Sequence, residues 1–408
     1  MSLPSARTVV TLPPGLSAAG QSAFAERARA AASLLEVRND LCADAEVDIT
    51  ALAKVVPLIV SQRGRPLAAH WLAAARWVDL PLGEEATAEV PRLLRSFHAE
   101  RPLSAGEALA HWRGVEAGAA RKHVEPLGEL HSAWRLLEVQ AALGPGSTVL
   151  ATGPLALPFR AVLSERNALD YCALDGRWAA APGQRLVEDA RRAAAAPVGT
   201  PRLGILGAHI AHSRSPLVHP APFDRIELPA DADVAGLLEA LRPHYRGFAV
   251  TRPFKRAVAA ALGSPIEAVN TVFRDGTGWG AANTDVDGAE ATLRALGARE
   301  VTALGGGGVA PALQQAAVRT GTMLHVRRRA DLRGARVCGA CVWTWPEELE
   351  PPAGLRLDGA QVAVIAYGAP GKAVAAQVEH LGGMAVRCGE TWFEAQAEAQ
   401  RRLWAGGC

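Results

Sequence analysis

The sequence predicts an α/β protein in which a compact (β/α)8 barrel, of the TIM type, precedes a second α/β module of two lobes. Three observations support this prediction. Strand-like and helix-like segments alternate through the first two hundred residues. The stretch 191–201 (RRAAAAPVGTP) then reads as a helix end followed by a linker. Further on, a glycine run at 305–308 lies between a strand-like and a helix-like segment, as in a Rossmann-like lobe.

The barrel is predicted from eight strand-like runs, a number that matches a (β/α)8 fold although the connections between them are short. Amphipathic or alanine-rich stretches between the runs, such as 18–32, 102–117 and 125–143, are expected to be helical. The strands are expected at 8–12, 34–38, 56–63, 77–82, 92–98, 120–124, 148–153 and 170–174.

Composition limits the classes of function. Lys and Arg (43) nearly balance Asp and Glu (41), which argues against a nucleic-acid or membrane-surface partner. The first residues lack the charged and apolar regions of a secretory signal, and no apolar run is long enough to span a bilayer. Six scattered cysteines predict free thiols in a reducing cytoplasm. The single CxxC, Cys338 and Cys341, has no second pair or nearby histidine, so we expect a structural role and no metal.

Charged residues follow several predicted barrel strands, where the catalytic groups of such barrels lie. Lys122 is one of only two lysines in this half, and a lysine close to His98 and several arginines suits Schiff-base chemistry on a carbonyl. The histidine can move protons and the arginines can bind a carboxylate. Taken singly, His98 or Lys122 is better explained by a structural or solvated role, and it is their combination at strand ends that favours function. The strand-end set is Glu36, Arg38, Arg63, Asp79, His98, Lys122, Arg160 and Gln184.

Five short motifs in this half resemble type I 3-dehydroquinate dehydratase: LEVRND (35–40), PLIVSQR (57–63), SFH (96–98), ARKH (120–123) and APGQ (181–184). The resemblance implies that Lys122 forms an imine with the substrate ketone and that His98 takes a proton and assists loss of a hydroxyl. It also implies that the carboxylate and hydroxyls of the substrate are bound by Glu36, Arg38, Arg63, Arg160 and Gln184.

Two positions depart from that family. A glutamate usually follows the arginine of the third strand, whereas this chain has RGRPL (63–67), and Ala180 stands where the family has serine. An alternative therefore stays open, in which the barrel is a degenerate scaffold.

The stretch from Gly247 to Asp285 concentrates the polar chemistry of the second half. Thr251 and Lys255, then Asn270 with Thr271, then Asn283, Thr284 and Asp285 each follow a strand-like run (248–250, 268–269 and 279–282). The edge of an α/β sheet collects ligand groups at such positions. A lysine can exchange a proton with a carbonyl or alcohol, and an aspartate can orient it. The alternative is a set of amide-rich turns.

Together with an SxS turn, these clusters resemble shikimate dehydrogenase. HSRSP (212–216), VTRPFK (250–255), AVNT (268–271) and NTD (283–285) occur in that family's order and spacing, over roughly 202–408. The resemblance implies that Ser213 and Ser215 bind the shikimate carboxylate. It implies that Lys255 and Asp285 are the catalytic pair. Thr251, Asn270 and Gln396 match groups that hold hydroxyls, and Tyr367 matches a tyrosine near the substrate.

The run TALGGGGVAPAL (302–313) predicts a phosphate cradle, because glycines let the backbone approach a ligand and the following helix N-terminus favours an anion. Arginines after the next strand (323–326) suit a 2′-phosphate, hence NADP. From Leu304 to Tyr367 the chain is short for the family, so we expect a trimmed Rossmann NADP lobe. The cofactor-binding residues are expected to be Gly305, Gly306, Gly307, Gly308, Val309, Arg327 and Arg328.

The two resemblances imply an enzyme of the shikimate pathway that acts on 3-dehydroquinate, 3-dehydroshikimate and shikimate with NADP, and we expect it to be cytoplasmic. Its oligomeric state stays open. The expected domains are the barrel (1–195), a shikimate-binding lobe (202–285, completed by 373–408) and an NADP lobe (286–372). The alternatives are activity in the dehydrogenase half alone, and a non-catalytic sensor that binds NADP or shikimate.

Overall fold

The computed structural model describes residues 7–85, 92–115, 118–345 and 348–406. It divides the chain into two compact units, Met1–Arg246 and Gly247–Cys408. The division falls within one strand, β11 (Tyr245–Val250), so that the predicted linker at 191–201 lies inside the first unit.

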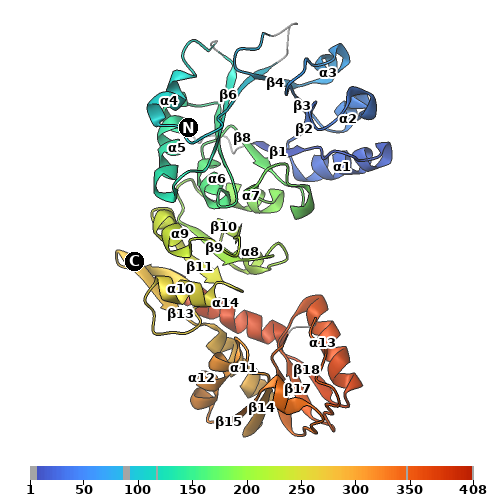
Figure 1. Ribbon diagram of the computed structural model, residues 1–408, viewed down its shortest axis with the longest axis vertical. Coiled ribbons are helices and arrows are strands. Elements are labelled where there is room, and N and C mark those ends of the chain that lie inside the picture. Colours follow the sequence, from blue (N-terminus) through green and yellow to red (C-terminus); the bar gives the residue numbers. More distant parts are fainter. Residues whose placement is uncertain (1–6, 86–91, 116–117, 346–347, 407–408) are drawn as a thin grey trace. The chain divides into compact units, whose positions relative to one another are not determined.

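The first unit begins with a parallel eight-stranded sheet in the order β7-β6-β5-β4-β3-β2-β1-β8, which confirms the predicted barrel (Figure 1). Two hydrogen bonds bring its edges together, from Ala168 N to Ser147 O (2.8 Å) and from Leu169 N to Thr148 Oγ1 (3.0 Å). The strands are β1 (Arg7–Thr11), β2 (Leu34–Arg38), β3 (Leu58–Ser61), β4 (Trp77–Pro81), β5 (Leu93–His98), β6 (Ala120–Pro126), β7 (Ser147–Thr152) and β8 (Leu169–Cys172).

Helices separate most of these strands, as the pattern predicts, but most are short, and the described residues between β4 and β5 contain none. The expected helix 102–117 is present only at Ala105–Ala110, and Glu116 and Ala117 lie outside the described residues. The expected helix 125–143 forms only from Arg135, because β6 extends to Pro126 and a 3₁₀ turn follows at Leu130–Trp134. The helices are α1 (Ala18–Ala31), α2 (Ile49–Val55), α3 (Ala69–Ala74), α4 (Ala105–Ala110), α5 (Arg135–Leu143), α6 (Leu157–Leu163) and α7 (Val187–Ala194).

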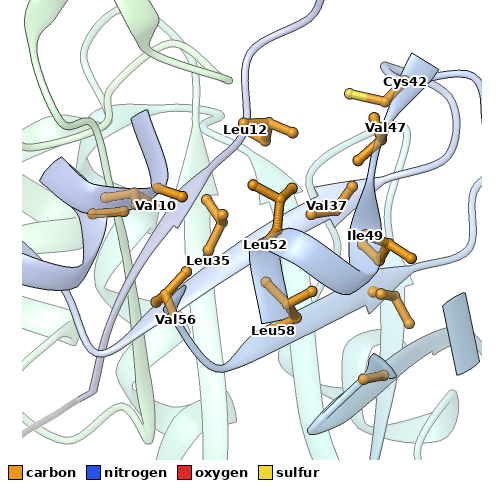
Figure 2. Close-up of a cluster of buried hydrophobic side chains, with 14 of the residues drawn as sticks. Val10, Leu12, Leu35, Val37, Cys42, Val47, Ile49, Leu52, Val56 and Leu58 are labelled. Atoms are coloured by element: carbon orange, nitrogen blue, oxygen red, sulfur yellow. The ribbon is translucent and has the colours of Figure 1, made fainter. Parts of the chain in front are cut away.

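Side chains alternate between the two faces of the barrel strands. On the outer face, apolar residues pack against the helices; Figure 2 shows Leu52 of α2 among Val10, Leu35 and Leu58 from three strands. The inner face carries an apolar layer that includes Val9, Leu34, Ile59, Leu94 and Tyr171. Two residues further along their strands come Thr11, Glu36, Ser61 and Ser96, which are also buried. The barrel interior therefore has an apolar layer followed by a polar layer.

The first unit continues beyond the barrel with β9 (Arg202–Gly207), α8 (Ser215–Val218), β10 (Phe223–Glu227) and α9 (Val234–Leu241). β9 and β10 pair in parallel. A buried ion-pair network joins these strands to the barrel: Arg202 contacts Glu165 (2.9 Å) and makes a bidentate pair with Asp224 (2.6 and 2.9 Å). These contacts explain why the barrel and the residues up to Arg246 form one compact unit.

The second unit starts with the end of β11, followed by α10 (Lys255–Ala261), β12 (Thr271–Asp275) and β13 (Gly278–Ala282). β12 pairs in antiparallel fashion with both β11 and β13. The last helix of the chain, α14 (Gly389–Gly406), returns to this sheet, where Trp404 Nε1 donates to Val272 O (2.9 Å).

The rest of the second unit is a parallel five-stranded Rossmann-like sheet in the order β15-β14-β16-β17-β18. α11 (Asp285–Leu296), α12 (Ala310–Thr320) and α14 pack on one face, and α13 (Gly368–His380) packs on the other (Figure 1). Between Arg327 and Gln361 the described residues contain one helical turn, Arg329–Leu332, in agreement with a trimmed lobe. The strands are β14 (Glu300–Leu304), β15 (Met323–Arg327), β16 (Ala340–Trp343), β17 (Gln361–Val364) and β18 (Met384–Arg387).

Candidate active sites

Lys122 lies at the centre of the polar layer of the barrel. It projects inward from β6 and is only 4% exposed. Its Nζ donates to Asp79 Oδ2 (3.0 Å) and to Glu36 Oε1 (3.4 Å), and it lies 4.0 Å from the ring centroid of Tyr171. A cation over an aromatic face is favourable, and two carboxylates compensate its burial.

Arg63 and His98 complete the charged cluster. Arg63 Nη2 donates to Asp79 Oδ2 (2.9 Å) and lies 3.2 Å from His98 Nε2. Arg63 Nη1 also donates to Ser96 Oγ (3.2 Å). The carboxylates are held in turn by hydroxyls, because Glu36 accepts from Thr11 Oγ1 (2.7 Å) and Ser61 Oγ (2.8 Å). These contacts form one connected network, which we call the barrel cluster. It consists of Lys122, Arg63, His98, Glu36 and Asp79.

The charges of the barrel cluster favour the ionised form of its carboxyls and the uncharged form of its histidine. Burial alone would raise the pKa values of Asp79 and Glu36, but the charges of Lys122 and Arg63 more than offset it and lower both. For His98, partial desolvation and the same two cations lower the pKa to about 3. At neutral pH the network therefore contains two carboxylates and an uncharged imidazole, and an uncharged imidazole can accept a proton.

The other predicted barrel residues lie apart from the hydrogen bonds of this cluster. Arg38 makes a bidentate pair with Asp40 (2.7 and 3.0 Å). Arg160 is buried in α6 and donates to Tyr171 O (2.6 Å). Gln184 accepts from Ala180 N (2.7 Å) and lines a cavity of about 800 Å³ that Arg185 and Arg225 also line. Substrate binding by Arg38, Arg160 and Gln184 stays a prediction.

In the second unit, Lys255 and Asp285 form an ion pair through Nζ and Oδ2. Lys255 is the first residue of α10 and Asp285 the first of α11, where a carboxylate is stabilised by the helix dipole. Asp285 N also donates to Asn283 Oδ1 (3.1 Å). Asp285 is nearly buried, whereas the Lys255 side chain is 22% exposed, so the ammonium stays within reach of a ligand.

Asn270 organises the polar residues beside this pair. Its Oδ1 accepts from Thr284 N (2.7 Å), Thr284 Oγ1 (3.1 Å) and Thr271 Oγ1 (2.9 Å). The buried Nδ2 of Asn270 has no hydrogen-bond partner within the described part of the chain. That amide is therefore left with donor capacity beside a lysine–carboxylate pair, which suits a hydroxylated ligand.

One detail of the predicted arrangement is wrong. We expected a strand at 268–269 with Asn270 and Thr271 following it, but β12 begins at Thr271. Because β12 is antiparallel to β11 and β13, its start lies at the same edge as their ends. The backbone of Asn270 bridges both neighbours, since Val250 N donates to Asn270 O (2.8 Å) and Asn270 N donates to Ala282 O (3.1 Å). The three clusters therefore do converge.

The remaining predicted substrate residues lie on other elements of the two units. Thr251 lies half-buried at the end of β11, and Gln396 is half-buried in α14. Tyr367 precedes α13, and its ring lies 5.1 Å from that of Phe393 in α14. In the first unit, Ser213 and Ser215 are nearly buried, and Ser213 Oγ donates to Ser215 Oγ (3.2 Å). The two serine hydroxyls therefore lie within hydrogen-bond distance of each other.

The glycine loop after β14 fits the pyrophosphate of a dinucleotide. Gly305 has a φ of 116°, and a Cβ there would lie 2.4 Å from Thr344 Oγ1. Gly307 and Gly308 have open space where a Cβ would stand, so that a ligand can approach their backbone. Val309 precedes α12, whose N-terminus follows the loop. Arg328 lies beside the loop, with its Cγ 3.6 Å from the site of a Gly306 Cβ, whereas Arg327 donates to Asp331 O (2.7 Å).

Several residues of these sites were not identified as site residues from the sequence. Ser61, Ser96 and Tyr171 contribute to the barrel cluster, and each carries only the ordinary signal of a strand residue that faces inward. In α14, Gln400 is buried and donates to Thr271 Oγ1 (3.3 Å). Gln400 lies one helical turn after Gln396, and this spacing is the signal that could have revealed it.

Fold and geometry define the class: an α/β protein with a parallel eight-stranded barrel and a Rossmann-like lobe, each unit holding a lysine paired with carboxylate. Over 154 residues the chain is 34% identical to the NADP(+) shikimate dehydrogenase of Syntrophobacter fumaroxidans, a match that covers 34% of this chain and 54% of the relative. It is 35% identical over 144 residues to that of Microcystis aeruginosa, covering 30% and 49%. The chain spans about half the length of the curated relatives it matches.

The chain also aligns with solved structures. The chain aligns over 99% of its length, and 96% of the other chain, with the dehydroquinate dehydratase and shikimate dehydrogenase from S. pombe, at 19% identity and a TM-score of 0.39. The shikimate dehydrogenase of Mycobacterium tuberculosis aligns over 51% of this chain and 94% of that one, at 27% identity and a TM-score of 0.40. No family model matches the sequence. Within the described residues, no helix is long and apolar enough to cross a membrane.

Proposed function

We propose that the second half of the chain is an NADP-dependent shikimate dehydrogenase. The observation that carries the proposal is the Lys255–Asp285 pair, placed beside an amide with unused donor capacity at one edge of the β11–β13 sheet. Identity of 34% with shikimate dehydrogenases supports it. The Ser213–Ser215 pair would bind the substrate carboxylate, and Asn270, Thr251, Tyr367 and Gln396 would contact the rest of the ring.

In this reaction the C3 ketone of 3-dehydroshikimate becomes the alcohol of shikimate. The glycine loop and Arg328 would hold NADPH, which would supply the hydride when bound. Lys255 donates a proton to the C3 oxygen as negative charge develops there, and Asp285 orients the ammonium group and stabilises it before transfer. In the reverse direction Lys255 accepts the proton of the C3 hydroxyl.

The test is an absorbance assay with shikimate and NADP. We expect NADPH to form with the wild type. A purified protein that turns over neither shikimate nor quinate with NADP or NAD would show that this half is not a dehydrogenase. Binding of shikimate or NADP without turnover would instead support the sensor alternative.

A second activity is favoured by the barrel cluster, in which a buried lysine lies near a histidine of low pKa. We propose that the barrel dehydrates 3-dehydroquinate to 3-dehydroshikimate. Lys122 first releases its ammonium proton, and the neutral amine then adds to the substrate ketone with loss of water to give an imine. His98 removes the C2 proton and gives it to the C1 hydroxyl, which leaves as water, and hydrolysis of the imine releases the product.

Borohydride trapping tests the barrel directly. With 3-dehydroquinate, borohydride would reduce the imine and leave a covalent adduct, which mass spectrometry would place on Lys122. The absence of an adduct, with the dehydrogenase assay positive, would favour the scaffold alternative. The two activities are consecutive, so 3-dehydroquinate and NADPH supplied together should yield shikimate. We also propose the domain limits given above and a cytoplasmic location.

A further inference from the structure

The turn that carries Ser213 and Ser215 is held in place by the barrel. Its central support is Arg225 of β10, which is 8% exposed. Arg225 donates twice to the backbone oxygen of Ser213, from Nε (3.2 Å) and Nη2 (2.9 Å). The backbone carbonyl of Ser213 is therefore held by a buried guanidinium group.

Arg225 is in turn fixed by the last helix of the barrel. Its Nη1 donates to Asp189 Oδ1 (2.5 Å) and to Glu188 Oε1 (2.9 Å), both in α7. Asp189 is 3% exposed, whereas the Glu188 side chain is 58% exposed. Asp189 is thus the partner that is shielded from water, and a shielded pair holds its geometry better than an exposed one.

A second contact from α7 reaches the other side of the turn. Arg192 Nη1 donates to Pro216 O (2.7 Å), one residue after Ser215. Two backbone oxygens of the turn are therefore connected to α7. Ser213 O is connected through Arg225, and Pro216 O accepts directly from Arg192. These ties use backbone oxygens, whereas Ser213 Oγ contacts Ser215 within the turn.

We infer that Asp189 and Arg192 of the barrel are positioning residues for the carboxylate-binding serine turn, so that the barrel determines shikimate affinity whether or not it is itself catalytic. This inference rests on the proposed dehydrogenase function. It follows because two small hydroxyls bind a carboxylate well only when their separation and direction are fixed before the ligand arrives.

The experiment compares three variants of the full chain, Asp189→Asn, Arg192→Gln and Glu165→Gln, by steady-state kinetics with shikimate and NADP. Asp189→Asn should raise KM for shikimate about tenfold, and Arg192→Gln about threefold, since each loses one charge-assisted contact to the support of the turn. Neither variant should change KM for NADP, and kcat should change by less than about twofold, because no group at the reacting atoms is altered.

Glu165→Gln is the matched control. It removes another ion pair between the barrel and β9, with Arg202, but does not touch the serine turn. We expect it to lower thermal stability and leave KM for shikimate unchanged. An equal rise in KM for shikimate in this control would mean that loss of any ion pair between the barrel and the following strands weakens binding, and it would overturn the inference. So would an unchanged KM in both Asp189→Asn and Arg192→Gln.

Arg192 is exposed, so Arg192→Gln keeps the test available if Asp189→Asn does not fold. If the wild type binds shikimate without turnover, the same comparison is made with dissociation constants from calorimetry. A wild type that neither turns over nor binds shikimate defeats the proposed function, and the inference with it. An active wild type with no effect of the α7 variants defeats the inference alone.

Discussion

Asp79 and Lys122 form a buried ion pair inside the barrel, with Nζ and Oδ2 3.0 Å apart and the aspartate side chain fully shielded from solvent. The same oxygen accepts from Arg63 (2.9 Å), so that one carboxylate serves two cations. Because both cations lie in a largely buried site, removal of this carboxylate would leave their charges poorly compensated.

We therefore expect Asp79→Asn to destabilise the protein strongly. It leaves Lys122 and Arg63 close together with Glu36 as their main remaining counter-charge, and breaking a buried pair costs about 3–5 kcal/mol. Urea unfolding followed by circular dichroism measures the change. Asp40→Asn is the control, because the Arg38–Asp40 pair is substantially exposed and should contribute less than about 1 kcal/mol. Equal effects of the two substitutions would contradict this account.

His98 should stay uncharged well below its ordinary range, because its pKa is lowered to about 3. The unfolded chain binds this proton near pH 6.5 and the folded chain near 3, so between these values the unfolded state binds more protons. The contribution of His98 to stability is therefore present above pH 6.5 and is lost as the pH falls towards 3. NMR of ¹³C-labelled histidine would locate the transition, with His98→Gln identifying its signal. A midpoint between 6 and 7 would contradict the prediction.

The dehydrogenase half should depend on Lys255 and Asp285 together. Lys255→Ala should lower kcat for shikimate by about 10²–10⁴, the usual contribution of a positioned proton donor. Asp285→Asn should lower kcat less, because it acts through the lysine, and the double variant should be little worse than Lys255→Ala alone. Lys372→Ala, at an exposed position of α13, is the control and should be as active as the wild type.

The sequence predicted the barrel well because its signals are local. All eight strands lie within a few residues of their expected bounds, and Lys122, His98 and Arg63 are in one cluster as expected. Which side chain pairs with which was not predictable. The spacing of Asp79 and Glu36 does not reveal that both contact Lys122, since those contacts depend on how the strands are staggered around the barrel.

The convergence of the polar clusters around Asn270 was predicted, but the strand arrangement that produces it was not. The polar clusters of the second half were expected to follow three strands at the edge of an α/β sheet. One of those strands does not exist, and the clusters meet because β12 is antiparallel to its neighbours. Strand direction follows from the whole sheet and not from the few residues of one run, so it could not be derived locally.

Arg328 should distinguish NADP from NAD. Its side chain lies beside the glycine loop, where a guanidinium can bind a 2′-phosphate. We expect Arg328→Gln to raise KM for NADP about tenfold and to leave activity with NAD nearly unchanged. Arg329→Gln is the control, because Arg329 Nη2 is directed to the backbone oxygen of Glu350. If Arg329→Gln raises KM for NADP as much as Arg328→Gln does, the assignment of the phosphate to Arg328 is wrong.

Two glycines of the same loop should differ in kind. Gly305 has a φ of 116° and no room for a Cβ beside Thr344, so Gly305→Ala should destabilise the protein even without cofactor, by about 1–3 kcal/mol. Gly307 has open space at the Cβ position, so Gly307→Ala should leave the stability of the free protein unchanged. The added methyl group would instead obstruct the approach of the pyrophosphate and raise KM for NADP. Thermal unfolding with and without NADP separates the two effects. A loss of stability in free Gly307→Ala, or none in Gly305→Ala, would contradict this prediction. It would mean that the space at these two Cβ positions does not determine the stability of the loop.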